Sequence, residues 1–301
     1  MNFVLIALCL FAGWILRVKN ILPENAYKSI NAWIVYIALP SVALHYIPTI
    51  TWNTDLLLAV TMPLIVWSGA WIVLTLASRL FHIPAATKTA LLLTAGLGNT
   101  SFVGFPLTQA YYGNEGFRIA VVCDQLTFIV LSTAGVLTAM HAAHKDTGGI
   151  PAGVLVKKIF SFPSFIAFLA ALIIPRFADL SFADPLFKTL SGTLVPLALF
   201  SVGMQIHFGE WKREIRFLAV GLSYKLLLAP AVMVIAAALF QVTGMVRNVS
   251  IFEASMAPMI TAAIIATEYN LHPKAANLMV SIGIPLSFVT TAIWWLILGA
   301  G

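Results

Sequence analysis

Three ionisable side chains lie deep inside apolar segments of this chain: Asp124 in AVVCDQLTFIV, Glu253 in IFEASMAPM and Lys225 in LSYKLLLAP. Charged groups at such depth are costly, and they usually face a partner or a water-filled cavity. A carboxylate there can exchange a proton or ligate Na⁺ together with neighbouring hydroxyls and carbonyls, so we favour ion coupling for the two acids. For Lys225, ion coupling and a helix-orienting ion pair with either acid are both open. Gln125, beside Asp124, completes the set of candidate coupling residues.

A second chemical signal comes from two stretches that should break their own helices. Residues 96–107 read GLGNTSFVGFPL, and residues 253–263 read EASMAPMITAA. Proline removes a backbone donor and clashes with the preceding turn, and glycine weakens a helix further. The sequence therefore predicts helix breaks over Asn99–Pro106 and Ser255–Pro258.

Backbone groups freed at such breaks can bind a ligand. The N-terminus of a half-helix attracts anions through its free N–H groups and its dipole, and freed carbonyls can hold a cation. One broken helix alone would favour a simple kink, but two in matching positions point to a substrate site at the membrane midplane. The candidate substrate-binding residues are Asn99, Thr100, Ser101, Gly104, Pro106, Ser255 and Pro258.

The elements that must position these residues are membrane helices. The chain has 301 residues, of which 60% are hydrophobic and only 9% charged, whereas a soluble protein carries about a quarter charged residues. Apolar runs long enough to cross a bilayer recur along the whole chain. We predict an all-α integral membrane protein with ten transmembrane helices at 2–18, 29–48, 56–78, 88–111, 117–140, 159–175, 186–206, 215–240, 249–269 and 275–298.

Basic residues between these spans predict an orientation. With ten spans, twelve Lys and Arg residues fall on one side of the membrane and four on the other. Because Lys and Arg collect on the cytoplasmic side, both termini are predicted to lie outside a plasma (inner) membrane. The net charge of +6 is thus a topology signal, and we expect no nucleic-acid partner.

The chain divides into two halves, 1–150 and 151–301, with five predicted spans in each. An odd number of spans gives the halves opposite orientations, which is the inverted-repeat plan of many secondary transporters. Weak internal likeness agrees, since YIALPSVAL in the second span resembles LVPLALFSVG in the seventh.

The motifs of both halves resemble the auxin efflux carrier family. GNTSFVGFPLTQAYYG is similar to the family's fourth-helix motif, and EASMAPMITAAIIATEYNLHP is similar to its ninth helix. LVPLALFSVGMQI resembles the seventh helix, and PENAYKSINAWIVYIALPSVALHYI resembles the first two. The resemblance covers nearly the whole chain, which lacks the long central loop of the long plant carriers. It therefore looks like a compact, bacterial-type organic-acid carrier, related in fold to the bile acid sodium symporters.

The resemblance implies two crossing broken helices, the fourth and the ninth. Helices 1, 2, 6 and 7 would form a scaffold, and helices 3–5 and 8–10 a moving transport domain; a homodimer would form through the scaffold. It places Asn99 on the family's substrate-contacting asparagine. The plant carriers have uncharged residues where Asp124 and Glu253 stand, and Glu253 also resembles the sodium-site glutamate of the bile acid symporters.

We therefore expect a secondary active transporter of a small organic anion, either a dicarboxylate or an auxin-like carboxylate. It would work by alternating access, as a symporter if it is coupled to H⁺ or Na⁺. The alternatives are a cation/proton antiporter, whose acids form the substrate site, and a membrane ligand sensor that does not transport. The sequence has no Walker A, Gly-x-Ser-x-Gly or His-Glu-x-x-His motif, so we expect neither an enzyme nor a cofactor.

Overall fold

The computed structural model describes residues 3–23, 25–143, 153, 162–179, 181–206 and 211–299. Within these residues every regular element is a helix, and one isolated antiparallel bridge joins Gly98 to Pro258. The predicted boundary between the halves at residue 150 lies outside the described residues, as do residue 2 and residues 159–161 of two predicted spans.

Six helical segments of the described chain are long and apolar enough to cross a membrane: Ala26–Thr49, Leu56–Leu80, Thr100–Ala143, Ser181–Gln205, Ile215–Leu239 and Pro273–Leu298. Phe3–Val18 and Pro163–Arg176 are shorter apolar helices. The prediction of an all-α protein is confirmed for the described residues. The count of ten spans and their inverted repeat stay predictions.

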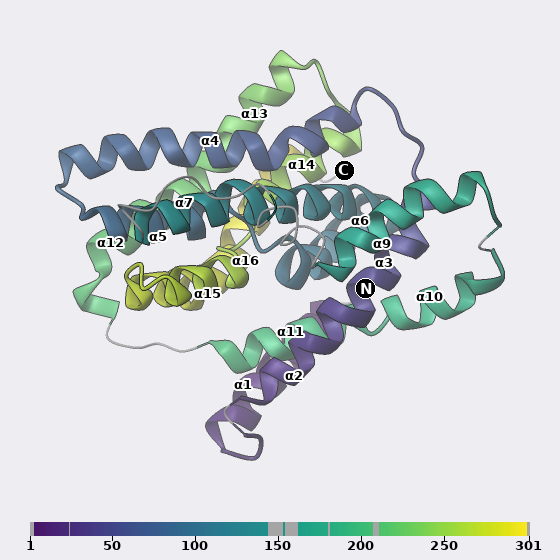
Figure 1. Ribbon diagram of the computed structural model, residues 1–301, viewed down its shortest axis with the longest axis horizontal. Helices are drawn as coiled ribbons and strands as arrows, with labels where there is room; N and C mark the ends of the chain where they lie inside the picture. Colours follow the sequence, from purple (N-terminus) through teal and green to yellow (C-terminus); the bar gives the residue numbers. More distant parts are fainter. Residues whose placement is uncertain are drawn as a thin grey trace.

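The helices form two groups (Figure 1). The first group contains α1 (Phe3–Val18), α2 (Ala26–Trp33), α3 (Leu39–Tyr46), α9 (Pro163–Ile173), α10 (Asp184–Ser191) and α11 (Leu194–Gln205). The second group contains α4 (Leu56–Leu80), α5 (Ala85–Gly96), α6 (Phe105–Val130), α7 (Val136–Ala143), α12 (Ile215–Ser223), α13 (Ala229–Leu239), α14 (Gly244–Ala254), α15 (Ile260–Glu268) and α16 (Pro273–Leu298).

In the first group, α1 packs along α11 and α3 packs against both α9 and α10. Small residues allow the first of these contacts to be close, because a Cβ added at Gly13 would lie 2.1 Å from the Phe200 carbonyl oxygen. Likewise, a Cβ at Gly203 would lie 2.1 Å from the Leu10 carbonyl oxygen. Close backbone approach at small residues is a usual way for helices to associate in a membrane.

Three prolines each follow a π-helical turn by two residues, and the helix continues through them. The turns are Ile34–Ala38, Thr100–Gly104 and Tyr224–Leu228, and the prolines are Pro40, Pro106 and Pro230. A proline lacks the N–H group, and its ring clashes with the carbonyl four residues earlier. A π turn is wider and changes the hydrogen-bonding register just before the proline. Pro106 consequently lies inside a helix, so the prediction that the fourth-span break extends to Pro106 is wrong.

Both broken helices are present in the structure. In the first, α5 ends at Gly96 and the helix resumes at Thr100, so the break covers residues 97–99. In the second, α14 ends at Ala254 and α15 begins at Ile260. The first break is therefore shorter, and lies earlier, than the pattern of glycine and proline predicts.

The two breaks pair with each other. The Asn99 N–H donates to the Ala257 carbonyl at 2.8 Å, and the Met259 N–H donates to the Leu97 carbonyl at 3.1 Å. Backbone at membrane depth must satisfy its polar groups within the protein. Each break supplies hydrogen-bond partners that the other has lost, so the two helices hold each other where they cross. The region formed by the two breaks, residues 97–99 and 255–259, is called the crossing below.

The half-helix that resumes at Thr100 ends at a turn inside α6. Gly113 has φ 63° and ψ −159°, a left-handed conformation that favours glycine. The part of α6 that precedes Gly113 completes the first broken helix. The part that follows continues through the π turn Leu131–Gly135 into α7, and it carries Asp124.

Candidate functional site

The polar residues that the sequence predicts as a site gather around the crossing, and all of them are buried. Each of the following side chains is at most 2% exposed: Asn99, Thr100, Ser101, Asp124, Gln125, Lys225, Glu253 and Ser255. Gly104, Pro106 and Pro258 are buried as well. The structure therefore places the predicted residues in one region, while their roles in binding and coupling stay predictions.

Asp124 anchors the start of the resumed half-helix. The Thr100 hydroxyl donates to Asp124 Oδ1 at 2.6 Å, and the Ser101 hydroxyl is hydrogen-bonded to the same carboxylate. Beside it, Gln125 Nε2 donates to the Ser164 hydroxyl of α9 at 3.0 Å. Asp124 thus connects the start of the half-helix to the later part of α6, after Gly113. Gln125 connects α6 to α9 of the first group.

Glu253 lies further along the same half-helix, beside Gly104 and Thr108. The Thr108 hydroxyl donates to Glu253 Oε1 at 2.6 Å, while Oε2 is buried without a hydrogen-bond partner. A Cβ added at Gly104 would lie 2.5 Å from Oε2, so the carboxylate occupies space that only glycine leaves open. Thr108 is a site residue that the sequence did not single out, because its partner is 145 residues away.

Lys225 donates a hydrogen bond to the backbone and to neither acid. Its Nζ donates to the Ala254 carbonyl, the last residue of α14, at 2.9 Å. Carbonyls at a helix C-terminus lack intrahelical partners, and the dipole there favours a cation. Among the ion pairs of the described residues, none joins Lys225 to Asp124 or Glu253. The direct ion pair that was one interpretation of Lys225 is therefore not formed.

Three predicted substrate-binding residues have structural roles here. The Asn99 Oδ1 accepts from the Phe102 N–H at 3.2 Å and so caps the half-helix, whereas its Nδ2 is buried without a partner. The Ser255 hydroxyl donates to the Phe252 carbonyl. Pro258 packs on Gly283 of α16, where a Cβ would meet its ring at 2.4 Å. Only the Asn99 amide retains an unused buried donor among these three.

The space at the crossing is too small for an organic substrate. A cavity of about 10 Å³ lies there, lined by Lys225, Glu253, Thr100, Thr127 and five apolar or glycine neighbours. That volume is the size of a single water molecule. The crossing is therefore closed in this conformation.

A much larger cavity, of about 560 Å³, lies between the two helix groups, with walls from α1, α11, α15, α16 and the start of α2. Ligand pockets in proteins usually measure about 300–1,000 Å³. No carboxylate is among the described residues that line it. Its polar lining consists of two cations, three amides and two hydroxyls: Arg17, Lys274, Asn25, Gln205, Asn277, Tyr27 and Ser281.

The charges around this open cavity suit an anion. The Arg17 Nη1 donates to the Ile206 carbonyl at 3.0 Å, which holds the guanidinium in place. A guanidinium has five N–H donors, so this bond uses one of them. Ile260, the first residue of α15, also lines the cavity, so the positive end of a half-helix dipole lies at its wall. Arginine, lysine and a helix N-terminus are all groups that bind carboxylates.

Sequence reasoning missed the open cavity. Arg17 and Lys274 stand at the ends of predicted spans, where a positive charge is already explained by membrane orientation. Nothing in the local pattern shows that α1 and α16 bring these two side chains to one cavity. The amides of Asn25, Gln205 and Asn277 are similarly ordinary at helix ends.

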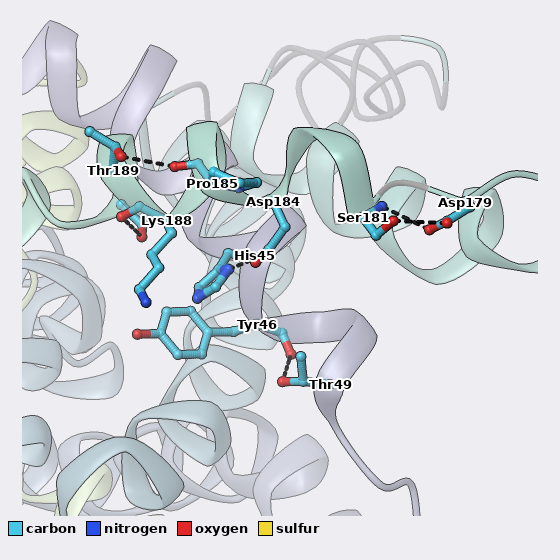
Figure 2. Close-up of polar contacts among 10 residues, drawn as sticks. His45, Tyr46, Thr49, Asp179, Ser181, Asp184, Pro185, Lys188 and Thr189 are labelled. Atoms are coloured by element: carbon cyan, nitrogen blue, oxygen red, sulfur yellow. Dashed lines mark hydrogen bonds and ion pairs between the residues drawn. The ribbon is translucent and has the colours of Figure 1, made fainter.

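A hydrogen-bonded pair in the first group, His45 with Asp184, lies apart from the crossing and the open cavity (Figure 2). His45 Nδ1 of α3 lies 2.6 Å from Asp184 Oδ1 of α10, and the His45 ring packs edge-on against the neighbouring Tyr46 ring. Asp184 is about half exposed, at 48%. Such a pair fixes the packing of α3 against α10. Among the described residues, no cluster of three His, Cys, Asp or Glu could hold a metal ion.

The profile of the family described as membrane transport protein matches residues 1–148 and 150–295. The chain belongs to this family. The resemblance to auxin efflux carriers is thereby confirmed, and so is the prediction of an integral membrane protein.

Individual relatives agree with this membership. An uncharacterized transporter of Methanothermobacter thermautotrophicus is 25% identical over 289 residues, covering 95% of this chain and 94% of that protein. An uncharacterized transporter of Methanocaldococcus jannaschii is 25% identical over 309 residues, covering 99% of each chain. A probable auxin efflux carrier component 9 of Oryza sativa is 28% identical over 143 residues, which is 45% of this chain and 31% of the plant protein. The similarity to the archaeal transporters thus runs along nearly the whole chain.

Proposed function

We propose that this membrane transport protein is a secondary active transporter of a small organic anion. The observation that carries the proposal is the open cavity of about 560 Å³, which Arg17 and Lys274 line without a carboxylate among its described lining residues. The name of the plant relative, a probable auxin efflux carrier, agrees with an organic-acid substrate. The proposed substrate class is a dicarboxylate or an auxin-like carboxylate.

Alternating access is supported by a difference between the two ends of the helix groups. At one end of α1, Arg17 borders the open cavity. At the other end, the Phe3 ring contacts Tyr111 of α6 with ring centroids 5.0 Å apart. Tyr46 of α3 likewise contacts Phe117 of α6 at 4.7 Å. A motion that separates these aromatic contacts and closes the cavity would expose the substrate to the other side of the membrane.

The proposal includes the finer architecture that the sequence predicts. The first helix group serves as scaffold, and the second moves with the crossing as the transport domain. Ten transmembrane helices form two inverted halves in the plasma membrane with both termini outside, and the scaffold helices provide a homodimer contact. In this scheme the unused Asn99 amide donates to the substrate carboxylate when the domain moves.

Transport by purified protein in liposomes tests the proposal. Uptake of radiolabelled monocarboxylates and dicarboxylates would be measured together with substrate-induced current. We expect uptake of at least one acid, with strong loss in Arg17→Gln/Lys274→Gln. Lys188→Gln is the matched control, because this exposed lysine of α10 does not line the cavity. Unchanged uptake in the folded double variant would reject the cavity as the binding site, and cation–proton exchange without any organic acid would favour an antiporter.

Coupling is tested with the charge-neutral variants Asp124→Asn and Glu253→Gln. If a proton or Na⁺ is coupled through these acids, each variant should transport with a weaker dependence on the ion gradient than wild type. The measurement is uptake with the H⁺ and Na⁺ gradients imposed separately. The same gradient dependence in both variants and wild type would remove the two acids from the mechanism.

A further inference from the structure

The Lys225 ammonium lies at the centre of the crossing and close to both broken helices. It donates to the Ala254 carbonyl, which ends α14. It also lies against the break that follows α5, since a Cβ added at Gly98 would be 3.0 Å from Nζ. One cationic group therefore lies next to the interruptions of both helices.

The position of Lys225 is fixed by its neighbours. It lies in the π turn Tyr224–Leu228, and the Tyr224 hydroxyl donates to the Val66 carbonyl of α4. Lys225 is 1% exposed, so its alkyl stem is enclosed along its length. A lysine side chain loses much rotamer freedom on such burial. Favourable contacts of the ammonium, such as its hydrogen bond to the Ala254 carbonyl, must therefore offset this loss of entropy.

The groups around the ammonium are those that a small hard cation would also bind. The water-sized cavity of about 10 Å³ is lined by Glu253 and by two threonines, Thr100 and Thr127, besides Lys225 itself. The C-terminal ends of α5 and α14 face the same place, because Gly96 lines the cavity and Ala254 accepts from Nζ. Carboxylate, hydroxyl and carbonyl oxygens are the ligands that hard cations prefer.

We propose that Lys225 is the resident cation of the crossing: its ammonium takes the place of a bound monovalent metal ion. A second cation in the same space would lie next to the ammonium, and like charges in a dry interior repel strongly. Transport therefore needs no Na⁺, a conclusion that rests on the proposed transport function. Truncating Lys225 opens a latent sodium site formed by Glu253, the two threonines and the freed Ala254 carbonyl.

Two variants separate charge from space. Lys225→Ala removes the ammonium and opens room for an ion, whereas Lys225→Met removes the ammonium but leaves the space filled. Each would be purified in detergent and compared with wild type in NaCl and in choline chloride at equal ionic strength. The readouts are the melting temperature and the binding of radioactive sodium, and neither requires a transport substrate.

We expect no saturable sodium binding by wild type or by Lys225→Met. Lys225→Ala should bind about one sodium ion per protein and gain melting temperature as NaCl replaces choline chloride, because a ligand that binds only the folded state stabilises it. Adding Glu253→Gln to Lys225→Ala should abolish both effects. Carboxylate uptake by wild type should be the same with Na⁺ and with choline.

Saturable sodium binding by wild type, or uptake that requires Na⁺, would overturn the proposal. So would a folded Lys225→Ala protein that binds no sodium. If neither Lys225 variant folds, the wild-type sodium measurement still decides, since a resident lysine and a native sodium site exclude each other. Absence of carboxylate uptake under every condition would contradict the proposed transport function and leave the sodium-binding result standing.

Discussion

The crossing and the open cavity are both polar, but they differ in which charged residues they contain and in how far these are buried. At the crossing, Asp124, Glu253 and Lys225 are all buried, and Glu253 and Lys225 line a space of about 10 Å³. The open cavity holds about 560 Å³ and is bordered by Arg17 and Lys274. The crossing brings acids together with one cation, whereas the described lining of the cavity contains no acid.

This difference separates two tasks that the sequence pattern places in one region. The crossing uses most of its polar groups internally: the breaks pair with each other, threonines donate to both acids, and Lys225 donates to Ala254. Its groups have little capacity left for a substrate in this conformation. The cavity has the space and the cations to bind an anion, so under the proposed function the substrate makes its first contact there, while the crossing holds the two broken helices together.

The largest effect is expected from filling the space beside Glu253. In Gly104→Ala, the new Cβ would lie 2.5 Å from Oε2 of this buried carboxylate. Overpacking of this kind costs about 1–3 kcal/mol, and the displaced carboxylate should also abolish transport. The measurements are the melting temperature and uptake in liposomes. Gly135→Ala is the matched control, because its Cβ would make only ordinary contacts at 3.6 Å; equal behaviour of the two variants would show that the crossing tolerates rearrangement.

Asn99→Ala comes next and tests whether the crossing reaches the substrate. The variant loses the cap on the Phe102 N–H, which should reduce stability by about 1 kcal/mol. We expect the protein to stay folded, with transport lost and substrate affinity reduced, because the unused amide donor that would meet the substrate after the domain moves is removed. Thermal unfolding and binding of the identified acid provide the two readouts. Full affinity in the folded variant would confine substrate contact to the cavity.

The cations of the cavity should have smaller, separable effects. Arg17→Gln and Lys274→Gln should each lower substrate affinity about ten-fold, which corresponds to about 1.4 kcal/mol per lost charged contact. Thermal stability should change little, because Lys274 is exposed and Arg17 is only partly buried, with a single hydrogen bond from Nη1 to the Ile206 carbonyl at stake. Affinity would be measured at low and high salt, since exposed charges are screened by salt. An affinity that is as salt-dependent in the double variant as in wild type would contradict the assignment.

The smallest effect is expected for the pair outside both regions. His45→Gln removes the contact with Asp184, which is 48% exposed. Partly exposed side-chain pairs of this kind contribute about 0–1 kcal/mol, so uptake should equal that of wild type and the melting temperature should change only slightly. A loss of transport as large as that in Asn99→Ala would show that packing between α3 and α10 controls the cycle.

Much of the fold follows from local chemistry. The apolar runs predict membrane helices because hydrocarbon leaves a backbone few other solutions, and the helices of the described residues lie close to those runs. The two interruptions were also predicted, because Gly, Ser and Pro weaken a helix wherever they gather. The boundary of the first break was not, since the π turn Thr100–Gly104 lets the helix pass through Pro106.

The sequence by itself determined the membrane class, the family, the two broken helices and the buried ionisable residues, because each depends on residue type and short-range spacing. Only the tertiary structure decided which groups meet. It gave Lys225 the Ala254 carbonyl in place of an acid, and it brought Arg17 and Lys274 to one cavity although 257 positions separate them (274 minus 17). Partner choice depends on how distant helices pack, and a local pattern carries no information about that distance.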